Sequence, residues 1–351
     1  MQNITKATDN KISLEELLPG DILVFKGKKD DLISRLIMAL TNGSDVSHGA
    51  IFVQKKDFVL AEAGSTGIHA HQMYEVQEGG SEVYVMRHKM AGKDGVEPVV
   101  PIAKDYVLQD LPYPYSDLIL LGLILIFKHG IKKKFVSSVV AEFLCLVAAE
   151  LKTIIENTTQ SGRHTMVCSS YVYQCYLDAS DVNPDLKLQV KNGDVGFKEL
   201  SFLGGNAQQS LSLFDLYVDY ADSHKDECKK SFCANVNLAS AKTLRPKNAI
   251  LADLEKLLSE ENEEPLPSFA AGEASIVVDI VKSIGDVIRA FVTFMKRDDV
   301  TFEEMLEIAR NQQAMFVTPN DLRYHLTNAD YVGLVQVGRN GEDYDPHFRE
   351  E

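Results

Sequence analysis

The sequence predicts a mixed α+β protein, in which a small antiparallel sheet is followed by packed helices and a mostly helical addition. Short β-branched and aromatic runs, separated by proline, glycine and polar turn residues, occupy residues 22–87. Long apolar segments, several of them with helical spacing, dominate from residue 117 onward. The chain has 351 residues, which exceeds one ordinary core and indicates two domains or one domain with a large insertion.

The predicted sheet begins after a Pro-Gly turn at residues 19–20, with a strand at 22–25. A short helix at 31–40 follows, and then two strands at 49–53 and 58–62 that are joined by the polar turn 54–57. A Gly-Gly turn precedes a further strand at 82–87, and a last strand is expected at 331–337. Because the strands at 49–53 and 58–62 are joined by a short turn, we expect this pair, and the small sheet that it starts, to be antiparallel.

The helices are predicted from apolar content and from their end signals. The segments 117–127 and 135–151 are very apolar, and the second carries apolar residues on nearly every face, which predicts a buried helix. The first is expected to be core, although it could instead line a pocket for an acyl chain. The stripe along Ala274 to Met295 indicates packing within the chain, with a partner helix or a membrane surface as the second interpretation. Thr301 and Glu304 form a capping-box pattern, and Thr318 with Pro319 opens another helix.

These elements predict four parts of the chain. Residues 1–215 form the core domain, with an apolar helical insertion at about 112–151. Residues 216–315 form a helical addition that contains an acidic linker at about 259–267. Residues 316–340 return to complete the core, and 341–351 form a loose tail.

Composition limits the classes of partner and the compartment. A net charge of −15 argues against nucleic acid and against attraction to anionic membranes. Five cysteines without a scaffold-like spacing indicate reduced thiols. The first eleven residues show no apolar signal segment, and the run 118–127 is too short to span a bilayer. The sequence therefore predicts a cytoplasmic protein, and leaves open export by a route that reads no N-terminal signal.

The strongest chemical signal is a histidine and a cysteine in two separate motifs. His48 stands at the mouth of an apolar strand, and Cys168 stands where a helix begins. A thiol becomes a nucleophile as its thiolate, which a helix N-terminus and a nearby imidazole both favour. Gly49 leaves room for the helix to approach the strand. The order of His before Cys is the reverse of the common papain-type order.

A catalytic imidazole needs a partner on its second ring nitrogen, and Glu62 is the best candidate. If the two strands pair with residue numbers that sum to 110, His48 and Glu62 face each other on one side of the sheet. A slip of one residue would send Glu62 to the other face, and His69, His71 or Gln72 could then take its place.

Two further sets of residues could ligate a metal, but neither reaches a recognised zinc spacing. They are His69 with His71, and His224 with Cys228 and Cys233. A solvated turn and a polar helix are the favoured interpretations of these two segments, so we expect no metal and no organic cofactor. Cys145 and Cys175 are expected to be core residues.

Five short motifs together resemble the permuted papain-like cysteine hydrolases, the YiiX/YaeF-like branch of the NlpC/P60 superfamily, which is related to lecithin–retinol acyltransferase-like enzymes. They are the Pro-Gly-Asp turn at 19–21, Ser-His-Gly-Ala-Ile at 47–51, Ala-Glu-Ala at 61–63, Cys-Ser-Ser-Tyr at 168–171 and Thr-Pro-Asn-Asp-Leu at 318–322. The resemblance implies a circularly permuted papain-like core. It covers roughly the first 215 residues and the return segment.

The same resemblance implies thiol chemistry at an amide or an ester. We expect a cysteine hydrolase that cleaves an amide bond as a peptidase or amidase, with Cys168 as nucleophile, His48 as base and Glu62 as its orienting partner. A lipid-directed phospholipase or acyltransferase that uses the same residues is the alternative. A non-catalytic binding module of the same fold is the second alternative. Each enzyme would be compatible with a toxin-like effector role.

Overall fold

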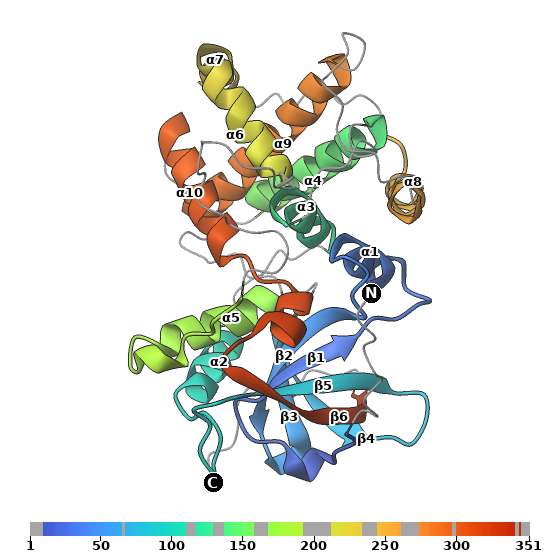
Figure 1. Ribbon diagram of the computed structural model, residues 1–351, viewed down its shortest axis with the longest axis vertical. Coiled ribbons are helices and arrows are strands. Elements are labelled where there is room, and N and C mark those ends of the chain that lie inside the picture. The colour runs from blue at the N-terminus through green and yellow to red at the C-terminus, as the bar shows by residue number, and fades with distance from the viewer. Residues whose placement is uncertain are drawn as a thin grey trace, which may run out of the picture.

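Six antiparallel strands close into a barrel in the order β1-β2-β3-β4-β6-β5, counted over the residues that the structure describes (Figure 1). The computed structural model describes residues 10–64, 67–109, 117–128, 137–157, 168–191, 212–233, 244–260, 274–296, 300–340 and 344. The strands are β1 (Ile22–Lys26), β2 (Val46–Gln54), β3 (Val59–Gly64), β4 (Gly67–Glu75), β5 (Ser81–His88) and β6 (Ala329–Arg339). The mixed α+β class is therefore confirmed.

Strand β4 was not expected from the sequence, which favoured a solvated turn around His69 and His71. The segment instead pairs along the whole length of β3, with Glu62 opposite His69 and Leu60 opposite His71. Its period-2 signal is present, because the two histidines alternate with the buried Ile68 and Ala70. Because these two histidines are polar, the segment was interpreted as a solvated turn and not as a strand.

The register of β2 and β3 differs from the predicted one by two residues. Glu62 pairs with Ala50, so the residue numbers sum to 112 instead of 110, and Glu62 lies diagonally across from His48. A shift of two residues keeps every side chain on its face of the sheet, whereas a shift of one would not. His48 and Glu62 therefore still point to the same side.

The alternation of strand residues separates two apolar cores. One face fills the barrel, with residues such as Leu23, Phe25 and Phe52. The other face carries Ile22, Val24 and Ile51 into a larger core shared with the helices. Strand β6 pairs with both β4 and β5, so a segment near the end of the sequence closes the barrel.

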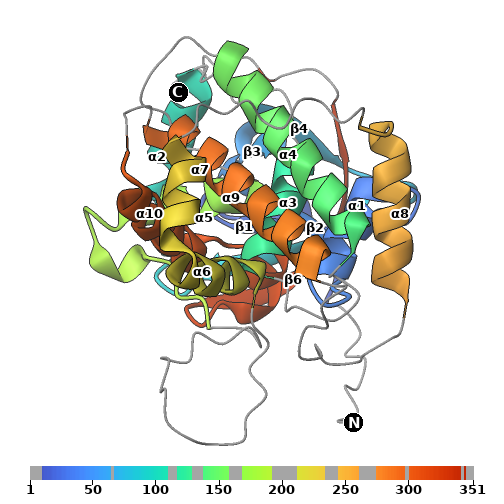
Figure 2. The same cartoon turned by 90° about the horizontal axis from the view of Figure 1, so that it is seen from above.

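Among the described residues, three helices pack against or beside the barrel, and the other α-helices form a helical body in the upper half of Figure 1. The first group is α1 (Leu32–Leu40), α2 (Val99–Leu108) and α5 (Cys168–Ala179). The helical body contains α3 (Asp117–Phe127), α4 (Ser138–Asn157), α6 (Leu213–Ser223), α7 (Lys225–Cys233), α8 (Lys247–Ser259), α9 (Ala274–Lys296) and α10 (Phe302–Met315). Helices α4 and α9 run side by side across this body (Figure 2).

The apolar segments of the sequence become the core of the helical body. Residues 118–127 of α3 are all buried, and α3 packs against α4 and α6. The α9 stripe is buried from Ile280 to Val292, against α4, α6 and α10, which agrees with packing within the chain. The predicted insertion and the helical addition thus share one core. Over the described residues, none of the helices combines the length and apolar character needed to cross a membrane.

The return segment joins the helical body to the barrel. Thr301 caps α10 through the expected capping box with Glu304. Thr318 and Asp321 bond reciprocally at the start of the next turn, which continues as a π-helical turn over Asp321–His325 into β6. Residues 112–116 and 129–136 of the predicted insertion, most of the acidic linker 259–267 and all of the tail 341–351 except Tyr344 lie outside the described residues.

Candidate active site

Cys168 is the first residue of α5, the helix that lies across β2 and β3. Two side chains of this helix fix its position. The Ser169 hydroxyl donates to the carbonyl of Val317 in the return segment at 2.6 Å, and the Tyr176 hydroxyl donates to the carbonyl of Gly20 at 2.6 Å. The thiol residue is 1% exposed, so it lies beneath the surface at the junction of helix and sheet.

Gly49 permits this close junction, as the sequence predicts. A Cβ at this position would lie 3.6 Å from the Cα of Ser169 and 2.9 Å from the Cδ1 of Leu322. An added Cβ would therefore press on Leu322 of the return segment, whereas its contact with the cysteine helix would be an ordinary van der Waals contact. The glycine next to His48 leaves room for both segments beside β2.

His48 lies on β2 and faces Glu62 and Cys168 with its ring. Its Nε2 is 2.6 Å from Oε2 of Glu62, which leaves Nδ1 as the nitrogen available to the thiol. Phe25 packs its ring edge-on against the imidazole, at 5.5 Å between centroids. The His48 side chain is 26% exposed, so one side of the ring can be reached from outside.

Burial and charge act in opposite directions on His48. Burial by itself would lower its pKa, but the charges of Cys168 and Glu62 and the hydrogen bonds to both of them raise the pKa to about 10. At neutral pH this geometry favours an imidazolium between a carboxylate and a sulfur. An imidazolium in contact with a thiol stabilises the thiolate form.

Glu62 lies on β3 and is only 7% exposed. The Nη1 of Arg339 donates to both carboxylate oxygens at 2.7 Å, and the Nε2 of His71 lies 3.5 Å from Oε1. Burial alone would raise the pKa of Glu62, but the charge and hydrogen bond of His48, and then the charge of Arg339, lower it to about 2. The carboxylate is therefore ionised at neutral pH and holds the imidazole ring in one orientation.

Arg339 is a member of this cluster that sequence reasoning did not assign, and His71 was considered only as a substitute for Glu62 or as a metal ligand. Arg339 ends β6 and is 277 positions away from Glu62 in the chain. It shares its face with Val335 and Val337, so alternation along the predicted strand could have placed it inside the barrel. Nothing in the sequence showed that β6 closes the barrel beside β4.

Asp117 brings the first turn of α3 within electrostatic range of the same histidine. Its pKa is raised by burial, and the positive charge of His48 opposes that rise. The apolar helix α3 therefore begins near the candidate site, although its following ten residues are buried. Sequence reasoning had singled out this helix for its apolar character and not for Asp117.

The other residues considered for metal binding do not form a site where the structure describes them. Across the described ranges, no group of three or more His, Cys, Asp or Glu side chains could hold an ion. His224 stacks on Tyr220 with centroids 4.1 Å apart, and the side chain of Cys233 lies outside the described residues. Cys145 lies 3.3 Å from the hydroxyl of Ser283, and Cys175 is buried, which raises the pKa of its thiol.

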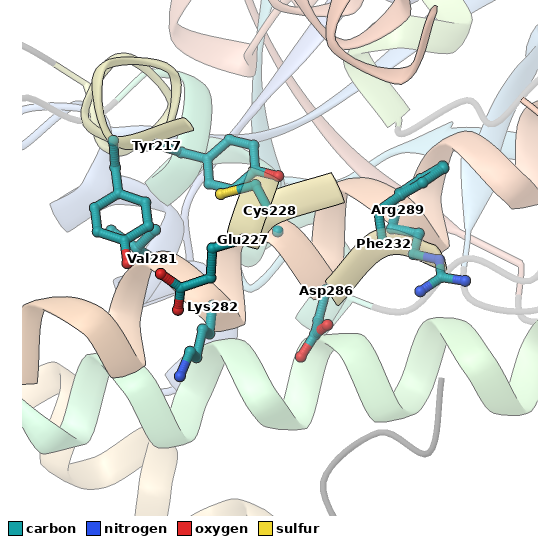
Figure 3. Close-up of a pocket in the computed structure, with 10 residues that line it drawn as sticks. Tyr217, Glu227, Cys228, Phe232, Val281, Lys282, Asp286 and Arg289 are labelled. Carbon is teal, nitrogen blue, oxygen red and sulfur yellow. The ribbon is translucent and has the colours of Figure 1, made fainter. Parts of the chain in front are cut away.

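Two cavities border these regions. The first, of about 50 Å³, lies in the helical body between α6, α7 and α9 (Figure 3). Its lining contains two acidic residues, Glu227 and Asp286, and two basic residues, Lys282 and Arg289. Its volume suits only a few water molecules. The second, of about 510 Å³, opens at the end of the barrel and is lined in part by Glu62 and Arg339. Of these two cavities, the second is therefore the larger and the one that borders the candidate site.

Compared with models of protein families, with curated proteins and with solved structures, the chain gives no match. Its function is therefore argued from the geometry of Cys168, His48 and Glu62.

Proposed function

We propose that this chain is a cysteine hydrolase that cleaves an amide bond through an acyl-enzyme, with Cys168 as the nucleophile. The observation that carries the proposal is the His48 ring, which is bound to Glu62 at 2.6 Å through Nε2 and interacts with Cys168 through a hydrogen bond and through charge. Nucleophile, base and orienting carboxylate in series are the arrangement that activates a thiol. The electrostatic interaction of His48 with Cys168, beside its short contact with Glu62, supports an enzyme over a non-catalytic module.

Each step follows from this arrangement. The Sγ of Cys168 attacks the acyl carbon, and the proton held by His48 passes to the leaving amine as the carbon–nitrogen bond breaks. His48 then takes a proton from water, whose oxygen attacks the thioester and releases the acid and the thiolate. Glu62 stays ionised and steadies the imidazolium. Backbone N–H groups at the start of α5 are placed to stabilise the oxyanion, because a helix N-terminus carries partial positive charge.

A permuted papain-like fold is part of the same proposal. Three features support it: the histidine strand precedes the cysteine helix, a carboxylate follows on the next strand, and the return segment touches the cysteine helix through Ser169. Strand β6, near the end of the sequence, closes the barrel that begins with β1. Segments from both ends of the core are therefore needed to enclose Glu62, as a permuted chain would supply them.

A peptide or another polar amide is the favoured substrate. The larger cavity beside Glu62 is open and polar, whereas the ten apolar residues of α3 are packed by protein. A lipid substrate remains the second candidate, because Asp117 places the start of that apolar helix near His48. These two candidates share one mechanism and differ only in the group that is bound.

The test is a product screen with a peptidoglycan digest and a phospholipid mixture, read by mass spectrometry. We expect products in the peptide digest only, and none with the Cys168→Ala variant. Cys145→Ala, which changes a thiol in the helical body, serves as the matched control and should retain turnover. Products from the phospholipids alone would favour the lipid enzyme, and products that survive Cys168→Ala would reject the nucleophile.

A further inference from the structure

The cavity at the end of the barrel has the size of a ligand site. Its volume is about 510 Å³, within the range of about 300–1,000 Å³ typical of small-molecule pockets. Most of the side chains that line it are polar, among them Lys28, Glu62, His71, Tyr74, Arg339 and Asn340. Gly79 and Gly80 leave another part of the wall without side chains. The space is thus polar, partly open and bordered by the carboxylate that orients His48.

The charges of the lining favour an anion. Lys28 and Arg339 carry positive charge, and Glu62 is the one carboxylate among the residues that line this cavity in the described structure. The oxygens of Glu62 already accept hydrogen bonds from His48 and Arg339, so they have little left to offer a cation. The chain as a whole carries a net charge of −15, which makes a cationic lining a local feature.

Arg339 is held in a way that leaves hydrogen-bond donors for a ligand. A guanidinium has five N–H donors, and only its Nη1 is bonded to Glu62. Its Nε and Nη2 make no hydrogen bond with the described part of the chain. The group lies over the Phe25 ring at 4.8 Å, which limits its rotation. An oriented guanidinium edge with Nε and Nη2 matches the two oxygens of a carboxylate.

We propose that this cavity is a subsite for a carboxylate group of the substrate. Because it assigns a substrate group, the inference rests on the proposed hydrolase function. Glu62 separates the cavity from His48, and the His48 ring separates Glu62 from the thiol. A bound substrate would therefore carry its carboxylate some bonds away from the scissile amide, as a peptide does with an acidic side chain or a free terminus.

The test measures binding without turnover, with the full 351-residue Cys168→Ala protein. N-acetyl-glutamate, N-acetyl-glutamine amide (a glutamine derivative without any carboxylate) and inorganic phosphate are titrated separately and followed by NMR of the histidine rings. We expect the glutamate derivative to bind at least ten-fold more tightly than the glutamine derivative, and to weaken as salt is added. Lys28→Met should weaken it about five-fold. Lys29→Met is the matched control, because Lys29 is exposed and does not line the cavity, and it should have no effect.

Other results would overturn the inference. Equal binding of the two derivatives, or no binding of either, would reject a carboxylate subsite. Phosphate binding ten-fold more tightly than N-acetyl-glutamate would also reject it, and would point to a phospholipid head group. Products in the peptide screen without any anion binding would remove the subsite alone. Anion binding in a protein that gives no products would remove the proposed function and, with it, the assignment to a substrate.

Discussion

The barrel and the helical body differ in where they place charged side chains. Among the described residues, the buried carboxylates are Asp21, Glu62 and Asp321, which lie in the barrel or in the return segment that leads into it. The helical body buries mainly hydrocarbon and keeps its ion pairs, such as Arg245 with Glu142, near the surface. Burying an ion costs free energy unless it is well paired, so the placement of these three groups calls for an explanation.

Partners distinguish a structural buried carboxylate from one that is suited to catalysis. Asp21 binds Arg87 and the backbone of Leu18, and so fixes the turn before β1. Asp321 binds Thr318 and His325, and so fixes the return segment. Glu62 alone among the three binds a histidine that also interacts with a thiol. Chemistry is therefore expected in the barrel, while the helical body contributes stability.

The largest expected contrast is between two histidines. Replacing His48 by Ala removes the proposed base, and we expect turnover to fall about 1,000-fold or more. His224→Ala is the matched change in the helical body, because His224 is exposed and its ring stacks on Tyr220. This variant should keep turnover within two-fold of the wild type. Both rates are measured on the substrate found in the product screen. Equal losses in the two variants would contradict the division between the regions.

A smaller contrast is expected between two glutamates. Glu62→Gln keeps the shape of the side chain but removes the charge that steadies the imidazolium, so turnover should fall roughly 10- to 1,000-fold. Glu142→Gln breaks a surface pair with Arg245 and should have no measurable effect on turnover. The decisive measurement is kcat at saturating substrate. An unchanged kcat for Glu62→Gln would reject its orienting role.

The pH dependence of stability should differ between the wild type and Glu62→Gln. Because the pKa of Glu62 is lowered from 4.5 to about 2, its contribution is complete above pH 4.5 and is lost as the pH falls toward 2. Because the pKa of His48 is raised from 6.5 to about 10, its contribution is complete below pH 6.5 and is lost as the pH rises through 10. We expect a gap on the order of 2 kcal/mol, widest between these limits. Urea unfolding at several pH values measures it, and a gap independent of pH would refute the pairing.

Local patterns in the sequence were enough to select candidate residues that the structure brings together, but not to predict the barrel that encloses them. Cys168 and His48 were identified from a helix start and a strand mouth, which are properties of neighbouring residues. Glu62 was placed on the correct face despite a register error of two residues, because strand parity depends only on even or odd spacing. His71 was named only as a substitute for Glu62 or as one of a metal-binding pair, and not as a neighbour of Glu62, because its segment was interpreted as a turn instead of a strand.

Long-range closure explains what the sequence could not supply. Arg339 reaches Glu62 only because β6 inserts between β4 and β5, and strand order is not encoded in the residues of one strand. The same limit applies to the helical body. The apolar segments of α3, α4 and α9 were identified as helices, but their assembly into one shared core depends on contacts between distant segments.

Close packing beside the site should affect turnover as well as stability. A Cβ at Gly49 would lie only 2.9 Å from Leu322 of the return segment, although its contact with Ser169 at 3.6 Å would be ordinary. Because Ser169 of α5 is bonded to Val317 of the same segment, we expect Gly49→Ala to shift the return segment and, through it, α5 relative to His48. Small displacements of reacting groups are costly, and we expect turnover to fall about ten-fold. Gly64→Ala on β3 is the control, since its nearest contact is 3.9 Å away. Wild-type turnover in Gly49→Ala would show that α5 does not depend on this contact.

The smallest effect on turnover is expected from the same type of change in the helical body. Gly122 of α3 faces Val147 of α4, where an added Cβ would lie 2.8 Å from Cγ1. Gly122→Ala should lower the free energy of unfolding by about 1 kcal/mol, because overpacking outweighs the better helix propensity of alanine. Turnover per folded molecule should not change, since the strain is taken up between two helices that only support the barrel. Thermal unfolding and kcat are compared with those of Gly49→Ala. A loss of kcat in Gly122→Ala would mean that the helical body sets the position of Cys168, and would require the two regions to be treated as one catalytic unit.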